Sequence, residues 1–262
     1  MSYLYYYTVG NREYFVDILY LSIKSLRYYS NHDILVIIDK QFKEKTVNKL
    51  REFSNIIICE CDNSNTPEIS SMRKLQIFDY NVEKYDSVIF LDADILINTD
   101  IDKISSLINK PDNNLLSVPI EHYKPVLGND KTIIDSHNVI FWSLKNYTNE
   151  ELNYLNDNNI HVFNTGLFGF KPNEIIKKHF SNIITYIKNY DKEFFYEQSF
   201  MNYYFNLKCN TTDKVTFNDS NYRMSPKLNE EYKNKIIHFT LCPDKYQSML
   251  IYINNFMKYI YD

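Results

Sequence analysis

Short apolar runs alternate with longer amphipathic stretches through the first half of the chain. The apolar runs predict buried strands at residues 3–9, 33–38, 56–59 and 87–91, and the amphipathic stretches predict helices at 13–29, 43–53 and 71–81. Ser70 or Ser71 is the expected N-cap of the third helix. Because fully apolar strands separated by helices are typical of parallel sheets, the pattern predicts an α/β fold with a mainly parallel central sheet flanked by helices.

The second half of the chain is less regular. Strands are expected at residues 115–118, 161–170 and 235–239, and helices at 174–190, 197–206 and 245–261. The polar region at 119–160 predicts a mobile loop or a small helical insertion. No internal repeat and no linker rich in Gly, Ser or Pro divides the sequence, so we expect one domain over residues 1–262.

The apolar run at 87–91 ends at two aspartates, Asp92 and Asp94, with Ala93 between them. Two carboxylates this close repel each other, and a divalent cation with oxygen ligands is the simplest way to keep both ionised. A turn in which the aspartates merely cap the strand is the alternative, because Asp is common in turns. The strand order places the pair at the carboxyl end of a parallel sheet, where ligands bind, and therefore favours a metal site for phosphate oxygens.

Composition limits the partners and the compartment. The net charge of −4 offers no basic surface for nucleic acid. The four cysteines show neither a metal-ligand spacing nor a disulfide framework, so we expect a reducing compartment. No apolar run reaches membrane-spanning length and no basic-then-apolar signal pattern opens the sequence, so we expect a cytoplasmic protein without a membrane span.

Several motifs, in order along the chain, resemble those of the glycogenin-like glycosyltransferases of family 8. They are Thr8-Val9-Gly10-Asn11-Arg12-Glu13-Tyr14, Arg73-Lys74-Leu75, Asp92-Ala93-Asp94, Phe163-Asn164-Thr165-Gly166, Glu197-Gln198 and Ile237-His238-Phe239. The resemblance runs from residue 3 to about residue 246. It implies a single GT-A (Rossmann-like) domain in which residues 1–118 form the nucleotide-binding half, ending in the region of the paired aspartates. Residues 119–262 would form the sugar and acceptor half, closed by the C-terminal helix.

The resemblance also implies contacts to the nucleotide and the phosphates. The implied nucleotide site contains Thr8, Gly10, Asn11 and Tyr14. Asn11 is expected to cap the first helix as well, and the two roles are compatible. Lys74, with Arg73 close behind, matches the family's basic residue near the donor sugar and the phosphates.

His238 is implied to be the third metal ligand beside Asp92 and Asp94, with Ala93 between them in the donor site. An imidazole joined to two carboxylates suits Mn²⁺ better than Mg²⁺, because Mg²⁺ prefers oxygen ligands. Mg²⁺ is the expected substitute. After this His-Phe pair the family carries a Gly and then a Lys. The present chain lacks that Gly and carries Lys245 one position late, where we still expect it to reach the diphosphate of the donor.

Asn164 and Gly166 are implied to line the donor sugar, because glycine allows a close approach of the backbone and an amide binds hydroxyls. A plain β-bulge at Gly166 is the alternative. Gln198 is implied to lie near the anomeric carbon, with Glu197 where the family has Asp. Glu197, Gln198 and Lys74 are therefore the candidate catalytic residues.

The implied reaction is the Mn²⁺-dependent transfer, with retention, of a hexose from a UDP-sugar to an acceptor hydroxyl. UDP-glucose is the first expectation for the donor and UDP-galactose the second, and the acceptor (a glycan, a protein or a small molecule) stays open. Self-glucosylation, UDP-sugar hydrolysis and a homodimer are further implications. Two other interpretations stay open: a non-catalytic nucleotide-sugar-binding scaffold, and a haloacid-dehalogenase-like phosphatase, whose later Gly-Asp-x-x-x-Asp motif this sequence lacks.

Overall fold

The N-terminal half alternates strands and helices, as its hydrophobic pattern predicts. This computed structural model describes residues 1–64, 66–103, 116–121, 148–158, 162–189, 197–209, 215–218 and 222–261. The first strands are β1 (Tyr3–Val9), β2 (Asp33–Asp39), β3 (Ile56–Cys61) and β4 (Ser87–Leu91), which lie in the order β3-β2-β1-β4 with every neighbouring pair parallel. Helices α1 (Tyr14–Tyr29), α2 (Lys43–Leu50) and α3 (Pro67–Met72) connect them, with a short 3₁₀ turn at Lys40–Phe42 ahead of α2. The predicted parallel core of the sheet is confirmed.

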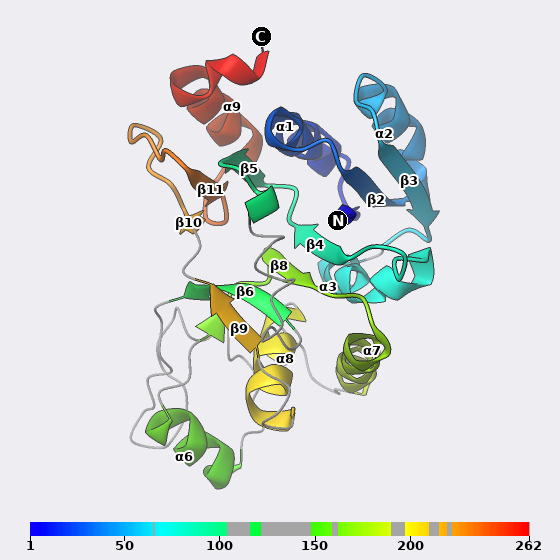
Figure 1. Ribbon diagram of the computed structural model, residues 1–262, viewed down its shortest axis with the longest axis vertical. Coiled ribbons are helices and arrows are strands. Elements are labelled where there is room, and N and C mark those ends of the chain that lie inside the picture. The colour runs from blue at the N-terminus through cyan, green and yellow to red at the C-terminus, as the bar shows by residue number, and fades with distance from the viewer. Residues whose placement is uncertain are drawn as a thin grey trace.

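The sheet continues beyond β4 with strands of mixed direction. β8 (Leu167–Phe170) lies antiparallel to β4, and β6 (Leu116–Glu121), β7 (Val162–Phe163) and β9 (Val215–Asn218) complete the eight strands. Because β8 runs against β4, it begins where β4 ends, with Leu167 opposite Leu91. The break at 164–166 in the predicted strand at 161–170 therefore lies at the carboxyl end of β4 (Figure 1).

A second, three-stranded sheet holds the turn that follows β4. It has the order β10-β11-β5, and these strands span Tyr222–Met224, Lys235–His238 and Ile95–Asn98. The hydrophobic pattern predicts β11 but not β5 or β10. The antiparallel register places His238 opposite Ile95, and the N–H of Phe239 donates to the carbonyl of Asp94 over 3.0 Å. A late segment of the chain is thereby held beside the paired aspartates.

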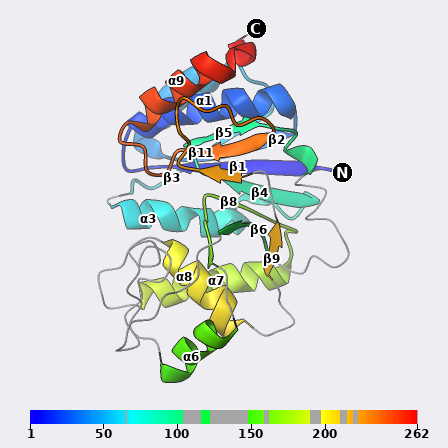
Figure 2. The ribbon, with the colours of Figure 1, turned by 90° about the vertical axis from the view of Figure 1, so that its left-hand side faces the viewer.

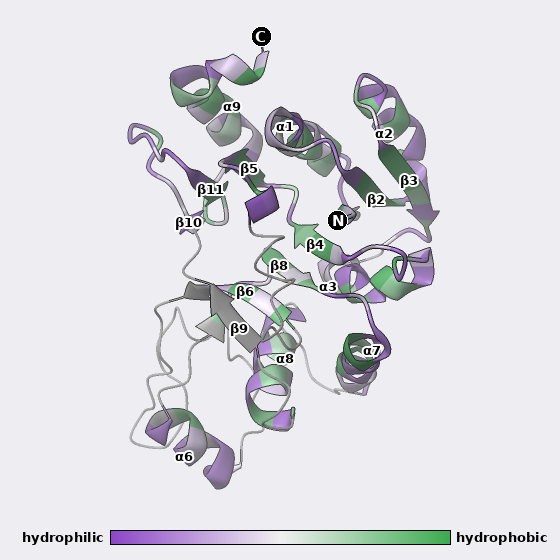
Figure 3. Cartoon of the chain, viewed as in Figure 1, coloured by the Kyte–Doolittle hydropathy of each residue, from purple (hydrophilic) through white to green (hydrophobic). Residues whose placement is uncertain are grey.

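Side chains of β1 alternate between two hydrophobic cores. Tyr5, Tyr7 and Val9 face a core that includes α1, β5, β11 and α9 (Lys245–Phe256). Leu4 and Tyr6 face the other, which includes β6, β8, α7 (Glu174–Lys188) and α8 (Glu197–Tyr203). Helices therefore cover both faces of the sheet, with α1, α2 and α9 on one side and α3, α7 and α8 on the other (Figures 1 and 2). The strands between them are mostly hydrophobic, whereas the helices also carry hydrophilic residues (Figure 3).

The two longest described helices are amphipathic. The buried side chains of α1 include Val16, Leu19, Ile23 and Leu26, and those of α7 include Ile176, Phe180, Ile183 and Ile187. Charged and polar residues occupy the rest of each surface, as expected for helices that pack on a sheet. None of the helices in the described part of the chain combines the length and the apolar character needed to span a membrane.

The helix expected at 71–81 differs from the observed one at its start. The helix begins at Pro67, and after Met72 it continues as the 3₁₀ segment Arg73–Tyr80. Its N-cap is Thr66, whose side chain accepts from the N–H of Ile69, so the expected cap at Ser70 or Ser71 is wrong. A Thr followed by Pro is a strong helix start, and this signal outweighs the later serines.

Other predicted elements differ in length. α8 is followed by a π-helical segment, Tyr204–Lys208, and α9 by a 3₁₀ turn, Lys258–Tyr261. In the polar region at 119–160, the structure describes α6 (Asn149–Asp157), which begins with a capping box between Thr148 and Glu151. The rest of the predicted insertion, at 122–147 and 159–160, lies outside the described residues. So do Leu115 and His161, the first residues of the strands expected at 115–118 and 161–170.

Phe168 packs β8 against β4 near the turn that follows β4. Its buried ring stacks on Phe90, with the ring centroids 5.1 Å apart. Phe168→Ala is expected to lower the free energy of unfolding by about 3–5 kcal/mol, since it leaves a cavity in the core. Ile175→Ala, at an exposed position on α7, should change it by less than about 0.5 kcal/mol. Urea denaturation measures both variants, and equal stabilities would contradict the role of Phe168.

Candidate active site

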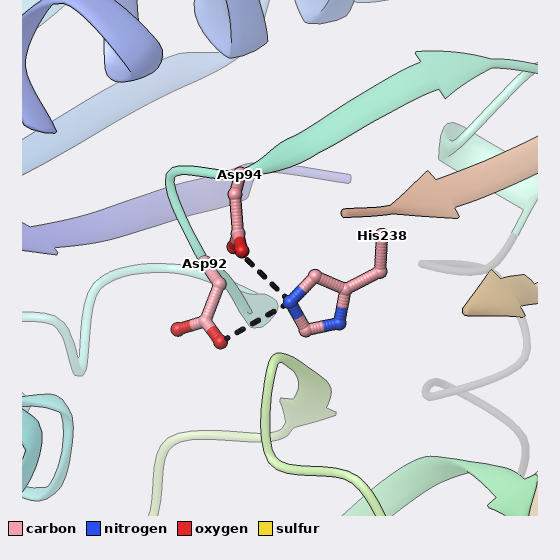
Figure 4. Close-up of side chains that lie close together, drawn as sticks. All are labelled: Asp92, Asp94 and His238. Atoms are coloured by element: carbon pink, nitrogen blue, oxygen red, sulfur yellow. Dashed lines mark hydrogen bonds and ion pairs between the residues drawn. The ribbon is translucent and has the colours of Figure 1, made fainter. Parts of the chain in front are cut away.

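Asp92 and Asp94 lie on the turn between β4 and β5 (Figure 4). Backbone hydrogen bonds hold this turn from two sides. The N–H of Asp92 donates to the carbonyl of Gly166 over 2.7 Å, and the carbonyl of Asp94 accepts from the N–H of Phe239 over 3.0 Å. Ala93 between them is buried in the core that contains α1 and α9. Both carboxylates are therefore placed by the packing of two sheets and not by the turn alone.

His238, at the end of β11, points toward the two carboxylates (Figure 4). Its Nε2 atom is 3.1 Å from Asp94 Oδ1 and 3.6 Å from Asp92 Oδ2. One ligand atom from each of the three residues lies within 4.8 Å of the others, and we call this group the metal cluster. His238 and Asp94 are buried, whereas the side chain of Asp92 is 33% exposed, so a ligand can reach the cluster from that side. Two carboxylates and one imidazole are groups that could hold a divalent cation.

Gly166 leaves the space that the metal cluster needs. A Cβ atom at this position would lie 2.3 Å from His238 Cε1 and 2.8 Å from Asp92 Oδ2. Any side chain would therefore displace at least one of the metal-binding groups. The glycine lies in the turn between β7 and β8, so the alternative of a plain bulge within one strand is not observed.

Lys74 lies on the other side of Asp92. Its buried ammonium is 3.4 Å from Asp92 Oδ1 and 2.7 Å from Glu197 Oε1, and it donates to the carbonyl of Thr165 over 3.3 Å. Burial alone would lower the pKa of this ammonium, but Asp92 and Glu197 outweigh burial and raise it. Lys74 is therefore a buried cation that connects the metal cluster to α8.

Thr165 joins the predicted sugar residues to one another. Its hydroxyl donates to Glu197 Oε1 over 2.7 Å, and its N–H donates to Gln198 Oε1 over 3.1 Å. One turn further along α8, the side chain of Asn202 bonds both the N–H and the carbonyl of Phe163, at 2.9 and 2.8 Å. α8 is thus docked on the segment before β8, and this brings Glu197 and Gln198 next to Asn164 and Gly166.

The two aspartates differ in how much positive charge faces them. Burial alone would raise the pKa of Asp94, but His238 and Lys245 outweigh burial and hold this pKa well below its ordinary value. The pKa of Asp92 is raised instead, because burial dominates over the attraction of Lys74 and His238, and because Asp94 repels the charge. The charge of Asp92 is therefore less fully offset than that of Asp94, and a cation between the pair would offset it further.

Lys245 reaches the cluster although it stands one position late in the sequence. Its ammonium is 2.5 Å from Asp94 Oδ2, at the first residue of α9. The adjacent Asp244 caps α9 and accepts from the hydroxyl of Tyr14 over 3.2 Å, and the same hydroxyl accepts from the N–H of Tyr246 over 2.9 Å. Tyr14, predicted to be a nucleotide residue, therefore fastens the start of α1 to the segment that carries Lys245.

The other predicted nucleotide residues, Thr8, Gly10 and Asn11, lie at the carboxyl end of β1. β1 and β4 are parallel neighbours, so Thr8 and Asp92 lie at the same edge of the sheet. Asn11 adopts the left-handed conformation, with φ of 67°, and its N–H donates to Asp39 Oδ2 over 2.9 Å. The expected capping of α1 by Asn11 is wrong, because Glu13 occupies the N-cap position and no side chain bonds there.

Asp39 lies beside these residues but was not predicted from the sequence. It is fully buried, and its carboxylate accepts from the N–H and the hydroxyl of Ser64, each over 2.9 Å. The guanidinium of Arg73 lies 3.3 Å from Asp39 Oδ1. Arg73 therefore forms an ion pair with Asp39, whereas the neighbouring Lys74 forms one with Asp92. A Cβ on Gly10 would lie only 2.8 Å from Asp39 Oδ1, which explains a glycine at that position. The signal was available, since Asp39 also directly follows a buried apolar run.

Comparisons with known proteins identify the family and the fold. A family model described as glycosyl transferase family 8 matches residues 8–245. A sequence search of curated proteins finds no match. Among solved structures, the chain is similar to the apo structure of the bifunctional glycosyltransferase WbbM, with 17% identity and a TM-score of 0.59 over 100% of this chain and 51% of that one.

Two further solved structures are similar over nearly the whole chain. The galactosyltransferase LgtC, in complex with donor and acceptor sugar analogues, has 12% identity and a TM-score of 0.56 over 97% of this chain and 96% of its own. The glycosyltransferase GlyE of Streptococcus pneumoniae has 12% identity and a TM-score of 0.55 over 99% of this chain and 64% of its own. These likenesses confirm the GT-A fold. The chain spans about half of the WbbM chain.

Gly166→Ala is expected to lower the affinity for Mn²⁺ at least about tenfold, because the added methyl group would displace His238 or Asp92. Gly10→Ala is the matched control, since its methyl group would meet Asp39, Ser64 and Ser70 instead. It should change the affinity by less than about twofold. Titration of free Mn²⁺ by electron paramagnetic resonance measures both, and equal losses in the two variants would contradict this role of Gly166.

Lys245 occupies one oxygen of Asp94 and should therefore compete with a metal. Lys245→Met keeps the aliphatic stem and removes the charge, so Mn²⁺ affinity without nucleotide should rise about fivefold, equivalent to about 1 kcal/mol for a partly exposed ion pair. Lys227→Met removes an exposed lysine paired with Glu230 and should leave the affinity unchanged. Calorimetric titration with Mn²⁺ measures the change. Weaker binding by Lys245→Met would rule out competition.

Proposed function

The chain belongs to glycosyl transferase family 8, and on this premise we propose that it is a Mn²⁺-dependent, retaining hexosyltransferase that uses a UDP-sugar as donor. Family membership makes it a glycosyltransferase and sets the phosphatase interpretation aside. The observation that carries the finer proposal is the buried ammonium of Lys74, which contacts Asp92 in the metal cluster and Glu197 in the predicted sugar site. One cation thus joins the binding place proposed for the diphosphate to that proposed for the anomeric carbon.

In this proposal the metal cluster holds Mn²⁺, with Mg²⁺ as the substitute. When bound, the metal neutralises the charge that develops on the diphosphate as UDP departs. The chain contributes ligands that already lie within 4.8 Å of one another. Lys74 adds a fixed positive charge beside Asp92, and Lys245 is proposed to turn from Asp94 to the diphosphate when the donor binds.

Glu197 and Gln198 are proposed to stabilise the anomeric carbon, with Asn164 and Gly166 beside the sugar. Glu197 is buried and its Oε1 accepts from both Lys74 and Thr165, so its carboxylate is oriented before a sugar arrives. In the transfer, the bond between C1 and the phosphate oxygen breaks, and the acceptor oxygen forms a bond to C1 on the same face. The departing phosphate oxygen takes the proton of the acceptor hydroxyl, so a separate base is not required.

The nucleotide is proposed to lie along the carboxyl edge of the sheet, where α/β folds bind their ligands. Thr8, Gly10, Asn11 and Tyr14 would contact it. Two observations support this placement. Thr8 shares an edge with Asp92, and Tyr14 is bonded to both residues that flank Lys245. The uracil end and the diphosphate end of the donor would therefore be held by connected parts of the chain.

UDP-glucose is the first donor that we propose and UDP-galactose the second. The two sugars differ in the orientation of one hydroxyl, and LgtC, which shares the fold, is described as a galactosyltransferase. The acceptor is a hydroxyl of a glycan, a protein or a small molecule. The proposed acceptors include hydroxyl groups of the chain itself, which has 24 tyrosines.

Asp92→Asn should lower kcat/KM for Mn²⁺-dependent UDP release at least about 100-fold, because the amide keeps the shape but loses the charge that the metal and Lys74 require. Asp100→Asn removes a partly exposed carboxylate that pairs with Lys103, and it should keep the wild-type rate. Detection of UDP with and without Mn²⁺ measures both. Undiminished UDP release by Asp92→Asn would contradict the proposed site.

The same assay tests the donor and the acceptor. Purified protein receives Mn²⁺ with either UDP-glucose or UDP-galactose, and UDP and the intact mass of the protein are then measured. Faster release from UDP-glucose supports the first donor, and a hexose added to the intact mass indicates self-glucosylation. Donor binding without any release of UDP would identify a scaffold and overturn the catalytic proposal.

A further inference from the structure

β10 brings a tyrosine to the side of His238 that faces away from the aspartates. Tyr222 lies on β10, which pairs in parallel with β11, and its ring centroid is 5.9 Å from that of His238. The hydroxyl of Tyr222 contacts His238 Nδ1, the ring nitrogen that points away from Asp92 and Asp94 (Figure 4). The same hydroxyl donates to Asn164 Oδ1 over 3.0 Å. The imidazole is thus held between the metal cluster and a tyrosine.

The direction of each hydrogen bond in this group is determined by a backbone donor. The N–H of Gly166 donates to Asn164 Oδ1 over 2.8 Å, so this atom is the amide oxygen and not the amide nitrogen. An oxygen can only accept, so Tyr222 donates its one hydrogen to Asn164. The hydroxyl must then accept from His238 Nδ1, which carries a proton. The donors run in one direction, from His238 through Tyr222 to Asn164.

A proton at Nδ1 leaves Nε2 as the nitrogen that binds a cation. Nε2 is also the atom that faces both aspartates, at 3.1 Å from Asp94 and 3.6 Å from Asp92. When a cation occupies the space between Nε2 and the aspartates, the proton on Nδ1 stays hydrogen-bonded to Tyr222.

We propose that Tyr222 is a positioning residue that fixes the tautomer and the ring orientation of His238, so that Nε2 binds the divalent cation. The inference rests on the proposed metal site and deepens it. Hydrogen-bond partners behind a metal-bound histidine typically change metal affinity about 10- to 100-fold. Asn164 gains a second role, because its oxygen anchors both the tyrosine and the Gly166 turn.

The first test compares two tyrosine variants of the full chain. Tyr222→Phe keeps the ring and removes the hydroxyl, and we expect Mn²⁺ affinity without nucleotide to fall about 10- to 100-fold in a paramagnetic resonance titration. Tyr232→Phe is the matched control. The hydroxyl of Tyr232 bonds Glu230 and the N–H of Lys227, and these residues precede β11, at the end of that strand opposite to His238. The control should bind Mn²⁺ like the wild type.

Two further measurements separate positioning from packing. In the His238→Ala background, Tyr222→Phe should cause no additional loss of Mn²⁺ affinity, because Tyr222 acts through the imidazole. In ¹⁵N-labelled protein loaded with diamagnetic Zn²⁺, the Nδ1 proton of His238 should be protected from exchange with water. That protection should be lost in Tyr222→Phe.

The inference is overturned if Tyr222→Phe binds Mn²⁺ as tightly as the wild type, or if it weakens binding equally with and without His238. A wild-type protein that binds no Mn²⁺ would overturn the proposed metal site as well. The two failures are therefore distinguishable, because the first occurs in a protein that still binds the metal.

Discussion

Electrostatic repulsion among closely spaced carboxylates is the constraint on which the rest of the site depends. Asp92, Asp94 and Glu197 converge, and the ammonium groups of Lys74 and Lys245 offset their charge, with the His238 ring beside both aspartates. The Lys74–Glu197 pair is buried on both sides and is costly to break, because removing one partner leaves an uncompensated buried charge that destabilises a protein by about 3–5 kcal/mol. The compensation is incomplete at Asp92, whose pKa is raised by burial. The fold therefore holds an arrangement that a bound cation would relieve.

Two departures from a simple parallel sheet supply the groups that offset this repulsion. The reversal at β8 brings Gly166, with no side chain, against Asp92 and His238. The small sheet of β5, β10 and β11 then brings His238 beside Asp94, and α9 follows with Lys245. The parallel half therefore provides Asp92 and Asp94, and the irregular half provides Glu197, His238 and Lys245. Lys74, from the segment before β4, joins the two.

The sequence was most informative where one local signal was sufficient. An apolar run that ends in two aspartates predicts both a strand and the polar edge that follows it, and β4 and Asp92 are placed accordingly. β5 could not be read in this way, because its four residues continue the preceding apolar pattern almost without a break. Tyr222 could not be found either. Its role depends on where one hydroxyl points in space, and nothing in the sequence distinguishes it among 24 tyrosines. His238 was reached through family resemblance, since a lone histidine at the end of a strand has no local signal.

The separation of the cluster's residues along the chain also has a consequence for biosynthesis. Asp94 and His238 are 144 residues apart in the sequence. At about 5–20 residues per second, a ribosome needs about 7–30 s to make the intervening segment. During that interval Asp92 and Asp94 already exist, while the imidazole and the lysine of α9 have not yet been made. Lys74, which precedes both aspartates, is the cation available to them from the beginning. The full set of residues proposed to bind the metal therefore exists only late in synthesis, after nearly all of the sheet has been made.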